Sequence, residues 1–159
     1  PSFFRTASGE TGNDSEFHSI LDSIEADFEP DKIKDEKELQ GQLAVFLKTL
    51  KRKVEREVTI QDSNRLDILI DNVYVLEVKV PRGKTELRNL SAQIEEYKED
   101  YPFLAVVIGD KTKIATDSED ESYDSEFEKN LPVKIKEYAD KYKMRYNIRT
   151  IIFTIEKRR

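Results

Sequence analysis

Hydrophobic residues recur along the chain in two patterns, one typical of helices and one typical of strands. Apolar residues three and four positions apart predict four helices, over 14–30, about 31–53, about 85–100 and from 130 or 131 onwards. Stretches rich in Ile, Leu and Val predict strands over about 54–60, 65–70, 73–80, 103–108 and 146–155. This alternation of helices and strands indicates an α/β fold.

The connecting segments complete the expected organisation. Residues 103–108 are continuously apolar, so we expect this strand to be covered on both faces and to form a βαβ unit with the preceding strand and helix. Residues 111–131 are acidic and typical of a loop, with a short strand at 113–115 as an option. We predict a flexible tail over 1–13, an acidic amphipathic helix over 14–30, and one domain over 31–159.

The stretch from Arg65 to Lys79 places three charged residues in an otherwise apolar hairpin, namely Asp67, Glu77 and Lys79. A two-residue turn would put Asp67 and Glu77 on opposite faces, whereas a three-residue turn or a bulge pairs them. The second register also gives one apolar face, made of Leu66, Ile68, Ile70, Tyr74, Leu76, Val78 and Val80. We therefore predict that Asp67 and Glu77 face each other, with Arg65 and Lys79 on the same face.

Two carboxylates at cross-strand distance repel each other, so a cation is expected between them. The chain has no Cys and its only His lies far away in the sequence, so the oxygen donors suit Mg²⁺ or Mn²⁺ better than zinc. Lys79 follows Glu77 by two residues and projects from the same face. A metal ion and an ammonium group together suit a phosphate ester, where negative charge builds on oxygen during hydrolysis.

The spacing of Asp67 and Glu77-Val78-Lys79 resembles the motif of the PD-(D/E)xK nuclease superfamily, although Leu66 replaces the usual proline. The resemblance covers roughly residues 32–110 and implies a restriction-endonuclease-like core, in which helices flank a mixed central sheet. It also implies that Asp67, Glu77 and the Val78 carbonyl hold the metal ion. Lys79 would then orient the attacking water or stabilise the transition state.

Residues on the two neighbouring helices extend this resemblance. Glu36 falls within the apolar stripe of its predicted helix and resembles the helical glutamate that often joins the metal site in this superfamily; Glu38 lies outside the stripe and is the alternative. Gln93-Ile-Glu-Glu-Tyr97 resembles the QxxxY motif of RecB-like nucleases and type I restriction motor subunits. The resemblance implies that Gln93 and Tyr97 support the active site and position the nucleic acid.

The charge distribution qualifies the net charge of −6, which by itself disfavours a nucleic-acid partner. Residues 1–38 hold 11 acidic and 4 basic residues, a net charge of −7, so the remainder sums to +1. Asp117–Glu128 contributes seven acidic residues and no basic one. Outside these two acidic blocks the chain is moderately basic, and Lys157–Arg159 forms a basic tip. A weak contact with phosphate is therefore compatible with the sequence.

We expect a Mg²⁺-dependent or Mn²⁺-dependent nuclease that hydrolyses phosphodiester bonds in DNA. The alternative is a catalytically inactive nuclease-fold module that binds nucleic acid or a protein partner. The lack of cysteine favours a cytoplasmic location, and no apolar run is long enough to predict a membrane span. A homodimer stays open, as does membership of a larger parent chain, which the start at Pro1 suggests.

Overall fold

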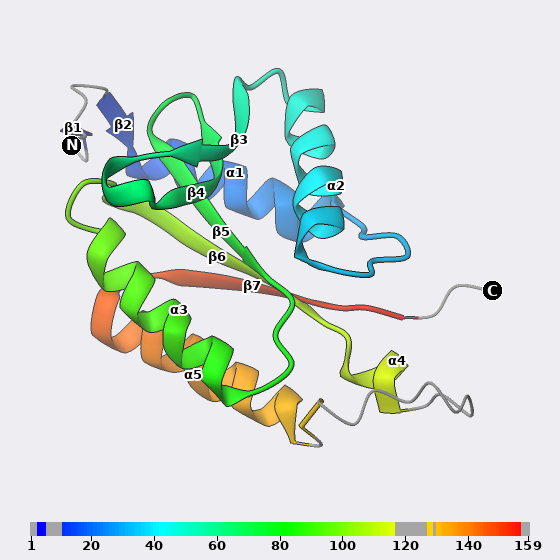
Figure 1. Ribbon diagram of the computed structural model, residues 1–159. Coiled ribbons are helices and arrows are strands. Elements are labelled where there is room, and N and C mark those ends of the chain that lie inside the picture. Colours follow the sequence, from blue (N-terminus) through cyan, green and yellow to red (C-terminus); the bar gives the residue numbers. More distant parts are fainter. Residues whose placement is uncertain (1–2, 6–10, 117–126, 129, 157–159) are drawn as a thin grey trace.

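A five-stranded mixed sheet lies at the centre of the fold in the computed structural model, which describes residues 3–5, 11–116, 127–128 and 130–156 (Figure 1). Its strands lie side by side in chain order: β3 (Val54–Thr59), β4 (Arg65–Ile70), β5 (Tyr74–Lys79), β6 (Phe103–Asp110) and β7 (Arg149–Thr154). Strands β3, β4 and β5 are antiparallel neighbours, whereas β5, β6 and β7 are parallel. The predicted α/β fold is confirmed at this level.

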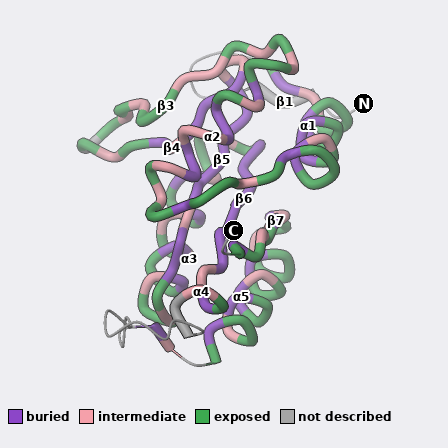
Figure 2. The backbone as a smooth tube through the Cα atoms, turned by 90° about the vertical axis from the view of Figure 1, so that its right-hand side faces the viewer, coloured by how far each residue is buried: buried purple, intermediate pink, exposed green. Residues whose placement is uncertain are grey.

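Helices cover both faces of the sheet and bury its apolar residues (Figure 1). One layer contains α1 (Asp14–Asp27) and α2 (Glu36–Thr49), and the other contains α3 (Lys84–Tyr97) and α5 (Leu131–Tyr146). All eight residues of β6 are buried between these layers, as its continuous apolar run predicts (Figure 2). In the described part of the chain, no helix combines the length and the apolar character needed to cross a membrane.

The β4–β5 turn has the predicted three-residue register. Ile70 pairs with Tyr74 and Ile68 with Leu76, so the turn consists of residues 71–73. Asp71 and Asn72 adopt φ angles of 53° and 65°. Asp and Asn tolerate this left-handed conformation better than other residues with a side chain, which explains why the chain turns here.

One part of the predicted hairpin is wrong: Leu66 does not share a face with Ile68 and Ile70. Leu66 packs with Leu69 in the cluster under α3 and α5, whereas Ile68 and Ile70 pack under α1 and α2. The regular alternation of β4 therefore breaks at Asp67. At this point the Asp67 carboxylate accepts a hydrogen bond from the Val78 N–H at 2.7 Å. The Asp67 side chain thus accepts a hydrogen bond that a backbone carbonyl accepts in a regular antiparallel ladder.

Several boundaries also differ from the sequence predictions. Helix α2 begins at Glu36 and not near residue 31, because Asp35 caps it and Lys32 has a positive φ of 51°. A short helix, α4 (Thr112–Thr116), replaces the strand considered at 113–115. Strands β1 (Phe3–Arg5) and β2 (Thr11–Asn13) pair where a tail is expected. Most of the acidic run, over 117–126, and the basic tip Lys157–Arg159 lie outside the described residues.

The acidic helix α1 is packed against the domain. Phe17, Ile20 and Leu21 are buried in the core, and the Phe17 ring stacks on Tyr74 at a centroid distance of 5.3 Å. On its exposed side, Arg149 of β7 forms ion pairs with Asp22 at 2.8 Å and with Glu25 at 2.6 Å. Part of the negative charge of this helix is therefore balanced within the domain.

The turn geometry leads to a stability prediction. Replacing Asn72 by Val places a β-branched side chain at a left-handed position, which should cost about 1–2 kcal/mol of unfolding free energy. The matched control is Asn72→Gly, because it also removes the hydrogen bond from Lys53 Nζ to Asn72 Oδ1 but tolerates the positive φ. Urea unfolding measures both variants. Equal stability of the two variants would contradict the assigned turn conformation.

Candidate active site

Asp67 and Glu77 come together where strands β4 and β5 leave their regular ladder. The register that pairs Ile68 with Leu76 brings position 67 opposite position 77. The Asp67 carboxylate lies against the backbone of β5, since its Oδ2 accepts the Val78 N–H. The structure thus places the two predicted carboxylates side by side.

Glu77 is almost fully buried, with 2% of its surface exposed. Burial raises the pKa of Glu77 well above its usual value, and the negative charge of Asp67 and a hydrogen bond with its side chain raise it further. Lys79 opposes this shift through its positive charge. The Oε1 atom of Glu77 is buried and has no hydrogen-bond partner in the described part of the chain. An ionised Glu77 would therefore need a further cation beside it.

Glu36 and Lys79 complete the group of charges. The Lys79 Nζ lies 3.8 Å from Glu36 Oε2, and Glu36 Oε1 accepts a hydrogen bond from the Val80 N–H at 3.4 Å. Burial raises the pKa of Glu36, with a further contribution from the charge of Asp67, although Lys79 acts in the opposite direction. The first turn of α2 therefore brings a third carboxylate to the end of β5.

Glu38, the alternative helical acid, has a different role. Its Oε2 accepts the Lys34 N–H at 2.9 Å, and its own N–H donates to Asp35 Oδ1 at 2.9 Å. These bonds satisfy backbone donors at the start of α2, as capping residues do. Of the two glutamates, only Glu36 is linked to Lys79 and Val80 by the contacts described here.

Gln93 and Tyr97 lie one turn apart on α3. Tyr97 is buried in the cluster under this helix, and its hydroxyl donates to the Arg65 carbonyl at 3.3 Å, at the start of β4. Burial raises the pKa of Tyr97, and the nearby charges of Glu77, Glu96 and Asp67 add to this shift. Tyr97 thus belongs to the core and also borders the carboxylate pair.

The Oε1 atom of Gln93 is buried and, among the described residues, has no hydrogen-bond partner. Only three buried side-chain oxygens in the described chain share this property, those of Glu77, Gln93 and Thr150. Two of them belong to residues singled out by the sequence motifs. Unpaired buried polar atoms are rare in folded proteins, so these oxygens are available to an ordered water, an ion or a ligand.

The donor set fits a hard cation through two carboxylates. No group of three or more His, Cys, Asp and Glu side chains in the described chain is arranged to hold a metal ion. Mg²⁺, however, commonly binds through one or two carboxylates and keeps several waters. The unpartnered Oε1 of Glu77, next to Asp67, meets this requirement. The ligand role of the Val78 carbonyl stays a prediction, because the described contact of Val78 is its N–H bond to Asp67.

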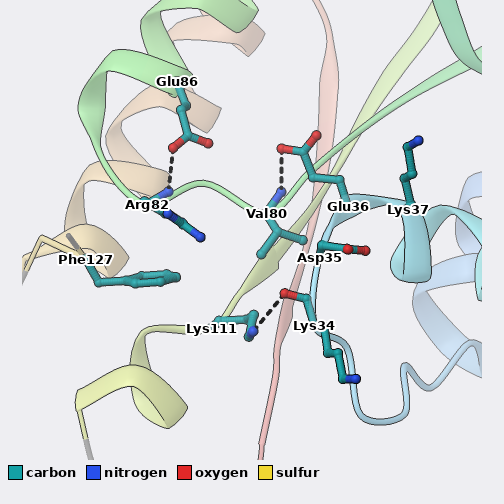
Figure 3. Close-up of a pocket in the computed structure, with 9 residues that line it drawn as sticks. All are labelled: Lys34, Asp35, Glu36, Lys37, Val80, Arg82, Glu86, Lys111 and Phe127. Atoms are coloured by element: carbon teal, nitrogen blue, oxygen red, sulfur yellow. Dashed lines mark hydrogen bonds between the residues drawn. The ribbon is translucent and has the colours of Figure 1, made fainter. Parts of the chain in front are cut away.

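A pocket of about 400 Å³ opens beside this group, at the carboxyl ends of the parallel strands β5 and β6 (Figure 3). Its lining residues are Lys34, Asp35, Glu36, Lys37, Val80, Arg82, Glu86, Lys111 and Phe127. Glu36 belongs both to the pocket and to the charged group around Lys79. The open end of a parallel sheet is a common place for a ligand.

The pocket is not predictable from the spacing of residues along the chain. Its cations come from the loop before α2, the first turn of α2, the turn after β5 and the segment after β6. Lys34 and Lys111 are 77 positions apart, yet Lys111 Nζ donates to the Lys34 carbonyl at 2.9 Å. No local spacing in the sequence reports such a contact, which depends on the order of strands in the sheet.

Comparison with known proteins adds no relative: no family model, no curated protein and no solved structure matches the chain. The functional interpretation therefore depends on the geometry and chemistry of the site.

The buried position of Glu77 predicts a pH-dependent effect of Glu77→Gln in metal-free buffer. Because the folded state holds the Glu77 proton more tightly than the unfolded chain, wild-type stability falls as pH rises from about 4.3 towards the raised pKa. The neutral Gln avoids this loss. Near neutral pH the variant should gain about 1–3 kcal/mol of unfolding free energy, and at about pH 4 the gain should vanish.

Denaturant unfolding at the two pH values measures this gain. The matched control is Glu137→Gln, an exposed residue of α5, which should change stability little at either pH. A gain from Glu77→Gln that does not change with pH would contradict the burial of an ionisable group at this position.

Proposed function

We propose that the protein is a metal-dependent nuclease of the PD-(D/E)xK type that hydrolyses phosphodiester bonds in DNA. The observation that carries this proposal is the buried Glu77 carboxylate beside Asp67, with an unpartnered oxygen and with Lys79 on the same strand. Two adjacent carboxylates, one of them buried, destabilise the fold unless a proton or a cation lies between them, and a bound cation would let both acids be ionised at neutral pH.

The strand arrangement supports a restriction-endonuclease-like core as the finer description of the fold. Strands β3, β4 and β5 are antiparallel neighbours, and Asp67 lies on β4 and Glu77 on β5. Strands β5 and β6 are parallel, and α3, which connects them, covers one face of the sheet through residues that include Tyr97. Glu36 comes from the helix before the sheet. Each residue thus lies on the kind of element that the resemblance implies for it.

The chain's own groups have distinct roles in the proposed reaction. A bound Mg²⁺ or Mn²⁺ would supply an activated water and would neutralise charge on the phosphate. Asp67 and Glu77 would hold this ion, and the Glu36 carboxylate, which lies near Lys79, borders the site. The bond from the Val78 N–H to Asp67 fixes the orientation of that carboxylate.

Lys79 supplies positive charge where the phosphate oxygens become more negative. It lies 3.8 Å from Glu36 Oε2, a distance that orients the ammonium without a tight ion pair, so the group stays available to a ligand. Gln93 contributes a buried amide oxygen with no partner in the described chain, and Tyr97 anchors α3 to the start of β4. Tyr97 thus helps to hold α3 beside the carboxylates, and both residues would border the path of the nucleic acid.

Cleavage of DNA tests the proposal directly. Purified protein with Mg²⁺ or Mn²⁺ should cleave at least one member of a panel of linear, circular, single-stranded and branched DNA, and EDTA should abolish the cleavage. Asp67→Ala and Lys79→Ala should each lower the rate by about a hundredfold or more, because one removes a ligand and the other removes charge stabilisation.

Asp140→Ala and Lys136→Ala are the matched controls, since both remove an exposed charge from α5, away from the site. Circular dichroism should show an unchanged fold for all four variants. Full activity of Asp67→Ala or Lys79→Ala would overturn the assignment of these residues. A wild-type protein that cleaves none of these substrates would favour a non-catalytic binding module.

A further inference from the structure

The backbone of Glu57 on β3 has an unusual conformation for a residue with a side chain. Its φ angle is 50°, in the left-handed region, whereas regular strands have negative φ angles. Glycine adopts this conformation readily, but other residues do so only at a cost in free energy. The Glu57 side chain is exposed and makes no hydrogen bond or ion pair with the described part of the chain. Its own contacts therefore do not explain the conformation.

Glu57 lies opposite Asp67 in the sheet. The register pairs Arg56 with Ile68 and Val58 with Leu66, so positions 57 and 67 face each other. At these two positions the pairing of β3 with β4 is interrupted, although it continues in the same register on both sides. Position 67 in turn lies opposite position 77 of β5. One row across three strands thus contains Glu57 and the two carboxylates of the candidate active site.

Both outer strands of this row exchange the faces of their side chains at it. On β3, Val54 packs against the cluster under α1 and α2, whereas Val58 packs against the cluster under α3 and α5. Two residues four positions apart share a face in a regular strand. On β4, Ile68 and Leu66 are divided between the same two clusters. Strands β3 and β4 therefore rotate together at the row that contains Glu57 and Asp67.

We propose that the left-handed backbone of Glu57 produces this joint rotation and so directs the Asp67 carboxylate onto β5, which makes Glu57 a positioning residue for the metal ligand. The proposal rests on the proposed nuclease function for the role of Asp67. A rotation of β4 alone would break its pairing with β3, whereas a rotation of both strands at one row leaves the pairs on either side intact. The Asp67 Oδ2 is then in place to accept the Val78 N–H at 2.7 Å.

The place of β3 in the sheet supports this role. β3 is the outermost strand on its side of the described sheet, so a left-handed residue in it disturbs only the pairing with β4 (Figure 2). Irregular strand residues occur preferentially at sheet edges and next to active sites, where they redirect a side chain. Backbone strain of this kind persists where the surrounding structure requires it. Glu57 meets both conditions.

Amide NMR spectra recorded in EDTA test the orientation of Asp67 without a metal ion. The reporter is the Val78 amide signal, and Asp67→Ala gives its position when the carboxylate acceptor is missing. Glu57→Thr places a β-branched side chain at the left-handed position, so the Val78 signal should move most of the way to that reference. Glu57→Gly tolerates the conformation and should keep the wild-type signal.

The same variants should differ in their affinity for Mn²⁺, measured by calorimetric titration. Loss of a residue that orients a metal ligand typically weakens metal binding by about 10–100-fold, and we expect a loss in this range for Glu57→Thr. Glu57→Gly and Glu57→Gln should bind as tightly as the wild type. The first keeps the backbone conformation, and the second removes only the charge of an exposed side chain.

The matched control is Lys51→Thr. Lys51 is an exposed residue before β3 with a φ angle of 60°, so this substitution introduces the same strain outside the row of carboxylates. It should lower the stability to urea about as much as Glu57→Thr does. It should change neither the Val78 signal nor the affinity for Mn²⁺.

Three results would overturn the proposal: an unchanged Val78 signal in folded Glu57→Thr, an equal change in Lys51→Thr, or weaker metal binding by Glu57→Gln. If Glu57→Thr does not fold, urea unfolding of Glu57→Gly and Glu57→Ala decides. The Gly variant should be the more stable, the reverse of the order in a regular strand, and the ordinary order would overturn the proposal. A wild-type protein that binds no metal would contradict the nuclease function, whereas the amide spectra would still show whether Glu57 orients Asp67.

Discussion

The arrangement of the site depends on one constraint: a buried carboxylate, Glu77, lies beside a second carboxylate, Asp67. Without a cation, burial and repulsion favour the protonated form of Glu77, as the raised pKa indicates. The surrounding structure nevertheless keeps both acids in place. The three-residue turn sets their register, and the Val78 N–H holds Asp67 where β4 departs from regular alternation. Such local irregularities are common next to active sites.

The rest of the fold offsets the energetic cost of this arrangement by burying apolar surface on both faces of the sheet. The sheet is covered by α1 and α2 on one face and by α3 and α5 on the other, so the middle of β5 and β6 contains aliphatic residues. Asp67 and Glu77 lie within β4 and β5, whereas Lys79 ends β5 and Glu36 begins α2. Glu36 comes from the first turn of α2, and the pocket extends from Glu36 along the carboxyl ends of β5 and β6. The carboxylate pair and the pocket therefore form one continuous charged region.

The sequence predicts the parts of this structure that depend on local patterns. Helical spacing identifies α1, α3 and α5, and the burial of β6 follows from its continuous apolar run. Sorting the charges of the hairpin predicts its register, which the pairing of Ile70 with Tyr74 confirms. The same reasoning misplaces Leu66, because it assumes regular alternation through Asp67. A strand pattern cannot reveal a break that is stabilised by a side chain binding the neighbouring strand.

Features that depend on contacts between residues far apart in the sequence cannot be predicted from local patterns. The start of α2 at Glu36 depends on Asp35 and Glu38 acting together as caps, in a segment where earlier residues also look helical. The pocket beside Glu36 depends on a contact between Lys34 and Lys111, which are 77 positions apart in the sequence. The apolar stripe favours Glu36 over Glu38, but the contacts of Glu36 with Lys79 and Val80 are visible only in the structure.

Calorimetric titration with Mg²⁺ and Mn²⁺ tests most directly whether Asp67 and Glu77 share a cation. We expect the wild-type protein and the exposed-site control Asp140→Asn to bind one metal ion at millimolar concentration or below. Asp67→Asn should lose this binding while keeping its fold. A wild-type protein that binds neither ion at millimolar concentration, or an Asp67→Asn variant that binds as tightly as the wild type, would contradict the central claim.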